Sequence, residues 1–148
     1  MVYLIRRVEQ DDASDVYALE RECFPDPYPK YLIDDLMKTE RDRFFVAVHS
    51  GRIVGYTVVT ITGRAAHLVS LAVHPLHRGQ GIGTSLLSAV AKELTLSKVT
   101  QVYLEVRKGN LDAISFYKRM GFEETSQIMH YYGDGEDALV MSKSVTDS

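Results

Sequence analysis

The sequence predicts a mixed α/β domain built on one largely antiparallel sheet of about seven strands, flanked by four helices. First, β-rich segments alternate with segments of helical periodicity in the order β-αα-βββ-α-β-α-ββ. Second, 148 residues suffice for one domain whose core needs no disulfide or metal. Third, a glycine-rich segment joins a central strand to a helix, which predicts one strand–helix–strand crossover. We expect a single domain over residues 1–145 and a frayed tail at 146–148.

Composition and charge exclude several classes of protein. Hydrophobic residues make up 45% and charged residues 25% of the chain, which excludes disordered, collagenous and low-complexity proteins. The net charge of -3 gives no broad positive field for nucleic acid, so an anionic ligand must be held locally. The absence of both a long apolar run and a secretory signal predicts no association with a membrane. The single cysteine, Cys23, forms no intrachain disulfide, and we expect a cytoplasmic protein.

The N-terminal segment is predicted to form a strand and two helices. Residues 2–8 are β-rich, and Asp11 and Asp12 are placed to cap a helix that the first proline ends. The segment 24–29 holds three of the four prolines, which fix φ and remove backbone donors. It is therefore expected to be a stiff loop, followed by a short helix at about 30–39.

Three consecutive strands are predicted next, at 44–48, 53–61 and 65–73. The first two form a hairpin around a turn that contains glycine, and the third extends the antiparallel sheet. Alternation along the third strand places His67, Val69, Leu71 and Val73 on one face, and Leu68, Ser70 and Ala72 on the other.

The C-terminal half is predicted to hold two helices and three strands. A helix at 83–97 carries one apolar stripe, and a strand follows at 101–106. A second helix opens at Asn110 and is closed by Gly121. Two final strands are expected at about 122–129 and 137–143.

The most informative segment runs from Val73 to Thr84 and has glycines at every second position from 79 to 83. Glycines where a strand turns into a helix let consecutive backbone N–H groups point at an anion on the positive end of the helix dipole. Arg78 can add a charge-assisted hydrogen bond to a phosphate. The segment matches neither the dinucleotide fingerprint nor the Walker motif, so a ligand other than NAD or ATP is implied. The alternative is a tight turn that binds nothing.

This segment resembles the acyl-CoA signature of the GNAT acetyltransferase superfamily. The motif Arg-x-x-Gly-x-Gly at 78–83 follows a strand that ends in Ser-Leu-Ala-Val, and the element order agrees along nearly the whole chain. The segments 103–110, 116–122 and 131–138 resemble those of protein N-terminal acetyltransferases, both Ard-type catalytic subunits and ribosomal-protein alanine acetyltransferases. The resemblance implies a GNAT-like fold and transfer of acetyl from acetyl-CoA to the α-amine of a protein or peptide.

The resemblance also implies where acetyl-CoA, the cosubstrate, binds. Its arm would pair as a pseudo-strand with the backbone of Leu71, Ala72 and Val73, and then run past Asn110 and Tyr117. Because these last two residues are seven apart, they share one helix face at a separation of about 10 Å. The pyrophosphate would lie near Arg78 and meet the N–H groups of Gly79, Gln80, Gly81, Ile82, Gly83 and Thr84.

Three side chains are candidates for catalysis. Tyr117 is the candidate acid that protonates the CoA thiolate, and a core tyrosine is the alternative. Glu105 is a charged residue in mid-strand and a candidate base, acting directly or through water; a surface ion pair is its alternative. His67 is a second candidate base because the usual pKa of histidine is near 6.5. No metal is expected, although His67 and Glu105 together could supply two ligands. The N–H of Val73 would polarise the thioester carbonyl.

The resemblance places the acceptor between the proline-rich loop and the loop that joins the last two strands. The residues implied are Phe24, Pro25, Asp26 and Tyr28 on one side and Tyr131 and Tyr132 on the other. Ordinary packing under a loop is the alternative for the aromatic residues. Asp26 lies where some Ard-type subunits carry an acid that helps favour acidic N-termini, whereas Phe24 and Pro25 resemble subunits that accept an initiator methionine, so the resemblance leaves the preferred N-terminus open. A weak base is enough to deprotonate an α-ammonium group, because this step costs about 1 kcal/mol at pH 7. Deprotonation of a lysine side chain costs between about 4 and 5 kcal/mol.

The expected partners are the N-termini of proteins or nascent peptides. The ribosome and an auxiliary subunit are further candidates, because some relatives use them. Two other functions stay open: acetylation of a small amine or a lysine side chain, and acetyl-CoA sensing without turnover.

Overall fold

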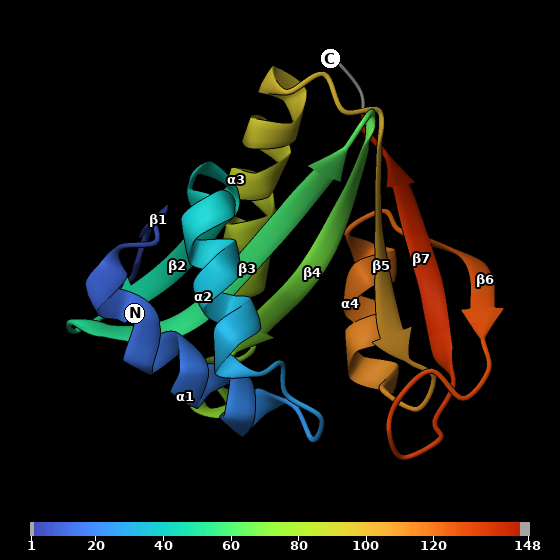
Figure 1. Ribbon diagram of the computed structural model, residues 1–148, viewed down its shortest axis with the longest axis horizontal. Helices are drawn as coiled ribbons and strands as arrows, with labels where there is room; N and C mark the ends of the chain where they lie inside the picture. Colours follow the sequence, from blue (N-terminus) through green and yellow to red (C-terminus); the bar gives the residue numbers. More distant parts are fainter. Residues whose placement is uncertain (1, 146–148) are drawn as a thin grey trace.

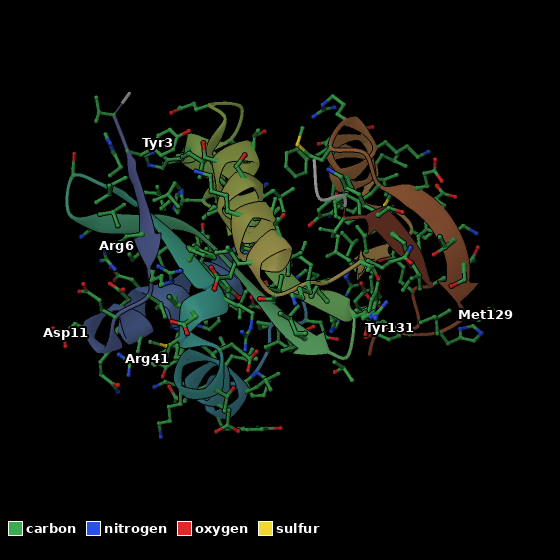
Figure 2. The ribbon with its side chains drawn as sticks, turned by 90° about the horizontal axis from the view of Figure 1, so that it is seen from above. Tyr3, Arg6, Asp11, Arg41, Met129 and Tyr131 are labelled. Carbon is green, nitrogen blue, oxygen red and sulfur yellow. The ribbon has the colours of Figure 1, made fainter. Side chains whose placement is uncertain are left out.

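The computed structural model describes residues 2–145 and has one seven-stranded sheet at its centre (Figure 1). The strand order is β1-β2-β3-β4-β5-β7-β6, and every neighbouring pair is antiparallel except β4 and β5. Helices α1 and α2 cover one face, and α3 and α4 cover the other (Figures 1 and 2). The predicted fold class and element order are confirmed. The tail predicted at 146–148 lies outside the described residues.

The element bounds agree with the predicted ranges to within a few residues. The strands are β1 (Leu4–Arg7), β2 (Phe44–His49), β3 (Arg52–Thr62), β4 (Ala65–Val73), β5 (Gln101–Arg107), β6 (Glu123–Ile128) and β7 (Ala138–Ser144). The helices are α1 (Ala13–Cys23), α2 (Lys30–Thr39), α3 (Ile82–Leu96) and α4 (Leu111–Arg119).

Asp12 occupies the N-cap position of α1, as predicted, but its side chain forms no capping hydrogen bond, and Asp11 is not the cap. Both aspartates lie in a short 3₁₀ turn that Glu9 caps. The Asp12 carboxylate accepts hydrogen bonds from the N–H of Glu9 at 2.7 Å and from the guanidinium of Arg6 at 2.8 Å. Burial raises the pKa of Asp12, but the bonds from Arg6 and Glu9 outweigh burial and leave the pKa below its usual value. This carboxylate therefore ties β1 to the start of α1.

The apolar stripes of the helices form two cores, one on each face of the sheet. On one face α3 contributes Leu86, Val90 and Leu94, which are buried against β2–β5. On the other face α1 and α2 contribute Val16 and Ile33, among others. Burying such side chains is the main stabilising contribution to the fold, about 1.5–3 kcal/mol for each.

The alternation predicted along β4 is wrong. The register between β3 and β4 shifts at Val69, which is the extra residue of a β-bulge. Leu68 packs in the core beneath α3, whereas Ala72 packs in the core beneath α1 and α2. Val69 and Leu71 likewise pack on opposite faces. One inserted residue reverses the direction of every later side chain, and the hydrophobic pattern of the sequence does not reveal it.

The parallel pair β4–β5 separates soon after it forms. Ala65–His67 pair with Gln101–Tyr103, after which the two strands diverge (Figure 1). Beyond His67, no strand among residues 2–145 pairs with this edge of β4, while β5 stays paired with β7 along its length. The sheet therefore contains an open backbone edge in its interior, and the candidate site lies there.

No helix within residues 2–145 has the length and apolar character required to cross a membrane.

Candidate active site

One cleft of about 440 Å³ lies between the end of β4, the N-terminus of α3 and the side of α4. The structure brings together nearly all of the residues expected to hold a coenzyme. Those that line this coenzyme cleft are Leu71, Ala72, Val73, Arg78, Gly79, Gly81, Ile82, Gly83, Thr84, Asn110 and Tyr117. Gln80 is exposed and does not line it.

The glycines shape the entry to α3. Gly81 is the N-cap of α3 and has a φ of +83°, and Gly79 has a φ of +78°. Residues other than glycine rarely adopt such positive φ angles. At Gly83 a Cβ would lie 3.1 Å from Cζ of Phe116, so this glycine permits the close approach of α3 and α4. The first N–H groups of any helix have no intrahelical acceptor. At α3 they border the cleft, which suits an anionic ligand.

Arg78 lines the coenzyme cleft and also forms a hydrogen bond within the protein. Its Nε donates to the carbonyl oxygen of Val73 at 2.9 Å, and Sγ of Cys23 donates to the same oxygen at 3.5 Å. The guanidinium therefore fixes the end of β4 to the glycine loop. Arg78 also lines the coenzyme cleft, so the expectation that it meets a phosphate stays a prediction.

A second cleft of about 420 Å³ lies between the loop 24–29 and the β6–β7 loop. Five of the six predicted acceptor-binding residues line this acceptor cleft: Phe24, Asp26, Tyr28, Tyr131 and Tyr132. Pro25 is exposed and does not line it. Figure 2 shows Tyr131 on the side of the C-terminal strands that faces the rest of the molecule, whereas Met129 lies on the outer side.

The two clefts meet at Tyr117. Four residues line both of them: Phe24, Leu71, Ala113 and Tyr117. Tyr117 is 8% exposed, and burial, with a smaller contribution from Tyr132, raises the pKa of its phenol well above the usual value of 10. The phenol is therefore neutral at physiological pH. Among residues 2–145 no side-chain hydrogen bond involves the Tyr117 hydroxyl, and Tyr117 lines both clefts, which leaves this group available at their junction.

The two base candidates contact each other. Nε2 of His67 lies 2.8 Å from Oε1 of Glu105, and the His67 ring stacks on Tyr103 with centroids 4.8 Å apart. The hydroxyl of Tyr131 donates to the same carboxylate oxygen at 3.4 Å. Glu105 lines the acceptor cleft, and both partners are largely buried. Among the described side chains, no three metal-ligating groups cluster closely enough to hold an ion.

The β6–β7 loop is tied to the end of β5 by Arg107. Its Nη1 donates to Asp134 at 2.8 Å and to Glu136 at 2.9 Å, and its guanidinium lies 4.1 Å from the ring centroid of Tyr132. Burial and then the neighbouring phenol of Tyr131 raise the pKa of Tyr132 to about 12. These contacts hold two neutral phenols over the acceptor cleft.

A direct contact also joins the two loops. The N–H of Gly133 donates to Oδ2 of Asp26 at 3.3 Å. Asp26 thereby closes one end of the acceptor cleft.

Two residues of the site escaped the sequence reasoning. Glu20 is 2% exposed and lines the acceptor cleft. Its signal was its position in the apolar stripe of α1, four residues after Val16 and one after Leu19. Arg107 had a weaker sequence signal. It is a basic residue at the end of a buried strand, and an acidic loop follows 27 residues later.

Comparison with known proteins agrees with this geometry. Residues 13–122 match the acetyltransferase (GNAT) family, and the chain belongs to that family. An N-alpha-acetyltransferase of Sulfurisphaera tokodaii is 37% identical over 95% of this chain and 92% of its own. The crystal structure of Ard1 from Thermoplasma volcanium has a TM-score of 0.94 and 31% identity over 99% of both chains. Arabidopsis thaliana Naa50, in complex with the bisubstrate analogue CoA-Ac-MVNAL, has a TM-score of 0.87 and 27% identity over 97% of this chain and 99% of its own.

Proposed function

We propose that the protein transfers the acetyl group of acetyl-CoA to the α-amino group of a protein or peptide. The observation that carries the proposal is the meeting of two clefts at one neutral phenol, Tyr117. A thioester held in one cleft and an amine held in the other would react at that point. The similar N-alpha-acetyltransferase, and the Naa50 complex with an analogue that joins CoA to a peptide, support the same division of the site.

The coenzyme cleft supplies the groups that acetyl-CoA requires. The glycine loop and the first turn of α3 would bind its pyrophosphate. The open edge of β4 at Leu71–Val73 would pair with its amide-bearing arm. Asn110 lines the same cleft while its Oδ1 accepts the N–H of Ala113, which caps α4 and leaves the side-chain NH₂ free to donate.

The residues of the junction account for each proton. His67 and Glu105, directly or through water, accept the proton that the α-ammonium group loses. The neutral amine then attacks the thioester carbonyl, and the N–H of Val73 stabilises the developing oxyanion. As the carbon–sulfur bond breaks, the phenol of Tyr117 hydrogen-bonds to the sulfur and supplies its proton. The attacking nitrogen gives up its second proton, directly or through water, to the resulting phenolate of Tyr117, while the first proton passes from His67 and Glu105 to the solvent. The products are the N-acetylated terminus, an amide, and CoA as its free thiol.

Proximity provides much of the expected acceleration. Direct attack within one site needs no covalent enzyme intermediate, and alignment of the two reactants replaces a bimolecular encounter. The half-buried Cys23 has a pKa raised mainly by burial, which favours the thiol over the nucleophilic thiolate. It is therefore a poor candidate for carrying the acetyl group.

The proposed partners are protein or nascent-peptide N-termini, presented at the ribosome or by an auxiliary subunit, in the cytoplasm. The single cysteine and the balanced charge support this setting.

A second candidate is acetylation of a small cationic amine such as a polyamine. Three carboxylates, Glu20, Asp26 and Glu105, line the acceptor cleft and would attract a polycation. The aromatic walls of Phe24, Tyr28, Tyr131 and Tyr132 favour a peptide side chain instead.

An acceptor panel separates these functions. CoA release is followed with acetyl-CoA and, in turn, peptides with a free N-terminus, Nα-blocked lysine peptides and spermidine. Turnover confined to the free N-termini supports the proposal. Turnover confined to spermidine or lysine replaces it with the second class of acceptor, and acetyl-CoA binding without any turnover supports a sensor.

A further inference from the structure

The Glu20 carboxylate is a buried negative charge that the proposed chemistry does not use. It lies near the C-terminal end of α1 and is 2% exposed. Oε1 accepts hydrogen bonds from the hydroxyls of Tyr56 and of Ser70, the latter at 3.2 Å, and Oε2 accepts the N–H of Tyr28 at 2.9 Å. All three donors are neutral. Within residues 2–145 no Lys, Arg or His forms an ion pair with Glu20.

Burying a carboxylate without a cation is costly, even when hydrogen bonds satisfy its oxygens. An apolar residue in the stripe of α1 would avoid that cost. The hydrogen bonds fix the position of Glu20 and leave its charge uncompensated. An uncompensated charge in a water-poor region acts over a longer distance than one at the surface, because the surrounding dielectric screens it less.

That charge lies beside the acceptor cleft, which carries other acids. Glu20, Asp26 and Glu105 line the cleft against one cation, Arg107, so the lining side chains sum to a formal charge of -2. The guanidinium is itself paired with Asp134 and Glu136 and offers little charge to a ligand.

The phenol of Tyr28 responds to the same potential. Its pKa is raised chiefly by burial, next by the neighbouring phenol of Tyr131, and then by the charges of Glu105 and Glu20. Glu20 and Tyr28 both line the acceptor cleft, so the charge of Glu20 lies where the acceptor would bind.

We propose that Glu20 is a specificity-determining residue: with Asp26 and Glu105 it makes the acceptor cleft select N-termini whose first side chain is uncharged or cationic, and reject acidic ones. This inference rests on the proposed function and names its substrate class. The fixed carboxylates attract the incoming α-ammonium group and repel a carboxylate on the first residue. Glu105 also serves proton transfer and Asp26 also joins the two loops, whereas Glu20 contributes charge from beneath the cleft.

The test compares peptides that differ only in their first residue, Ser, Lys or Asp. Values of kcat/KM are measured for the wild type, for Glu20→Gln and for the matched control Glu22→Gln, which removes an exposed charge from the same helix. We expect the wild type to prefer the Ser and Lys peptides to the Asp peptide. In Glu20→Gln the Ser-to-Asp ratio should fall by about fivefold, as expected for removal of a weakly screened charge. The control should keep the wild-type ratio.

A structural role for Glu20 would give another pattern. If Glu20→Gln lowers kcat/KM equally for all three peptides and keeps the ratio, the residue only positions Tyr28 and Tyr56, and the proposal is overturned. A wild-type preference for the Asp peptide also overturns it. If Glu20→Gln fails to fold, Asp26→Asn decides, because the amide oxygen of asparagine can still accept the N–H of Gly133. A lower ratio in that variant supports a charge-selective cleft, and an unchanged ratio refutes it.

A binding experiment distinguishes the failure of this inference from the failure of the proposed function. The same peptides are titrated calorimetrically into the protein saturated with CoA, where no reaction occurs. Weaker binding of the Asp peptide than of the Ser peptide, with the difference reduced in Glu20→Gln, supports the inference even if no peptide is acetylated. Equal binding of the Ser and Asp peptides contradicts it whatever the turnover.

Discussion

Nε2 of His67 and Oε1 of Glu105 lie 2.8 Å apart at the point where β4 and β5 separate. His67 is paired with Tyr103 in the last of the three β4–β5 pairs, and Glu105 follows two residues later on the same face of β5. The parallel pair therefore brings a histidine and a carboxylate into contact. Its divergence immediately beyond them opens the two clefts that meet at Tyr117.

Tyr117→Phe should lower turnover by about 100-fold, in the range expected for the loss of a positioned acid. The affinity for acetyl-CoA should change little, because the ring remains and no hydrogen bond from residues 2–145 is lost. Steady-state kinetics and calorimetry measure the two quantities on one preparation. Unchanged turnover would remove Tyr117 from the reaction.

Gly81→Val should weaken acetyl-CoA binding by at least about tenfold, because a β-branched residue resists the left-handed conformation that begins α3. Gly51→Val is the matched control: Gly51 lies in the β2–β3 turn with φ +76°, and a Cβ added there would have no neighbour within 4 Å. Calorimetry compares the two variants. Normal binding by Gly81→Val would place the phosphates elsewhere.

His67→Gln and Glu105→Gln should show strongly coupled effects on kcat/KM. If the two side chains act together on the proton of the amine, the double-mutant cycle should give a coupling free energy above about 1 kcal/mol. The coupling should persist after correction for acetyl-CoA affinity, measured on the same variants. Additive effects would instead assign the two residues independent roles.

Asp12→Asn should destabilise the protein in a pH-dependent manner. The folded-state pKa of Asp12 is lowered, so its contribution to the free energy of unfolding is present above the unfolded pKa of about 3.9 and is lost as pH falls through the folded pKa. At pH 7 the variant should lose about 1–2 kcal/mol, typical of hydrogen bonds to a charged group. Urea titrations at pH 7 and near pH 3 should show this difference shrinking at acid pH. A difference that does not depend on pH would exclude the ionised carboxylate as its cause.

Local patterns made much of the fold predictable. The helix α3 follows from its apolar stripe, and α4 begins after Asn110, whose side chain caps the N–H of Ala113. The two features that shape the site left no such pattern. The bulge at Val69 depends on the register with β3, and the separation of β4 from β5 depends on contacts between distant segments.

The candidate site was predictable to a similar extent. The glycine loop can be recognised in the sequence, because Gly79 and Gly81 have positive φ angles and Gly83 leaves little room for a Cβ beside Phe116. Glu20 has no signal of that kind: it reaches Tyr56 and Ser70, which lie 36 and 50 residues further along the chain. Its position in the apolar stripe of α1 marks it as unusual, but its partners are known only when α1, β3 and β4 are assembled.

One peptide that carries two amines tests the central claim most directly. The peptide has a free N-terminal serine and one internal lysine, and the position of the acetyl group is read by fragmentation mass spectrometry after reaction with acetyl-CoA at pH 7. We predict acetylation of the α-amine alone at early times, because the α-amine releases its proton at a cost about 3 kcal/mol or more below that of lysine. Acetyl on the lysine with a free N-terminus would contradict the assignment of this protein to α-amine acetylation.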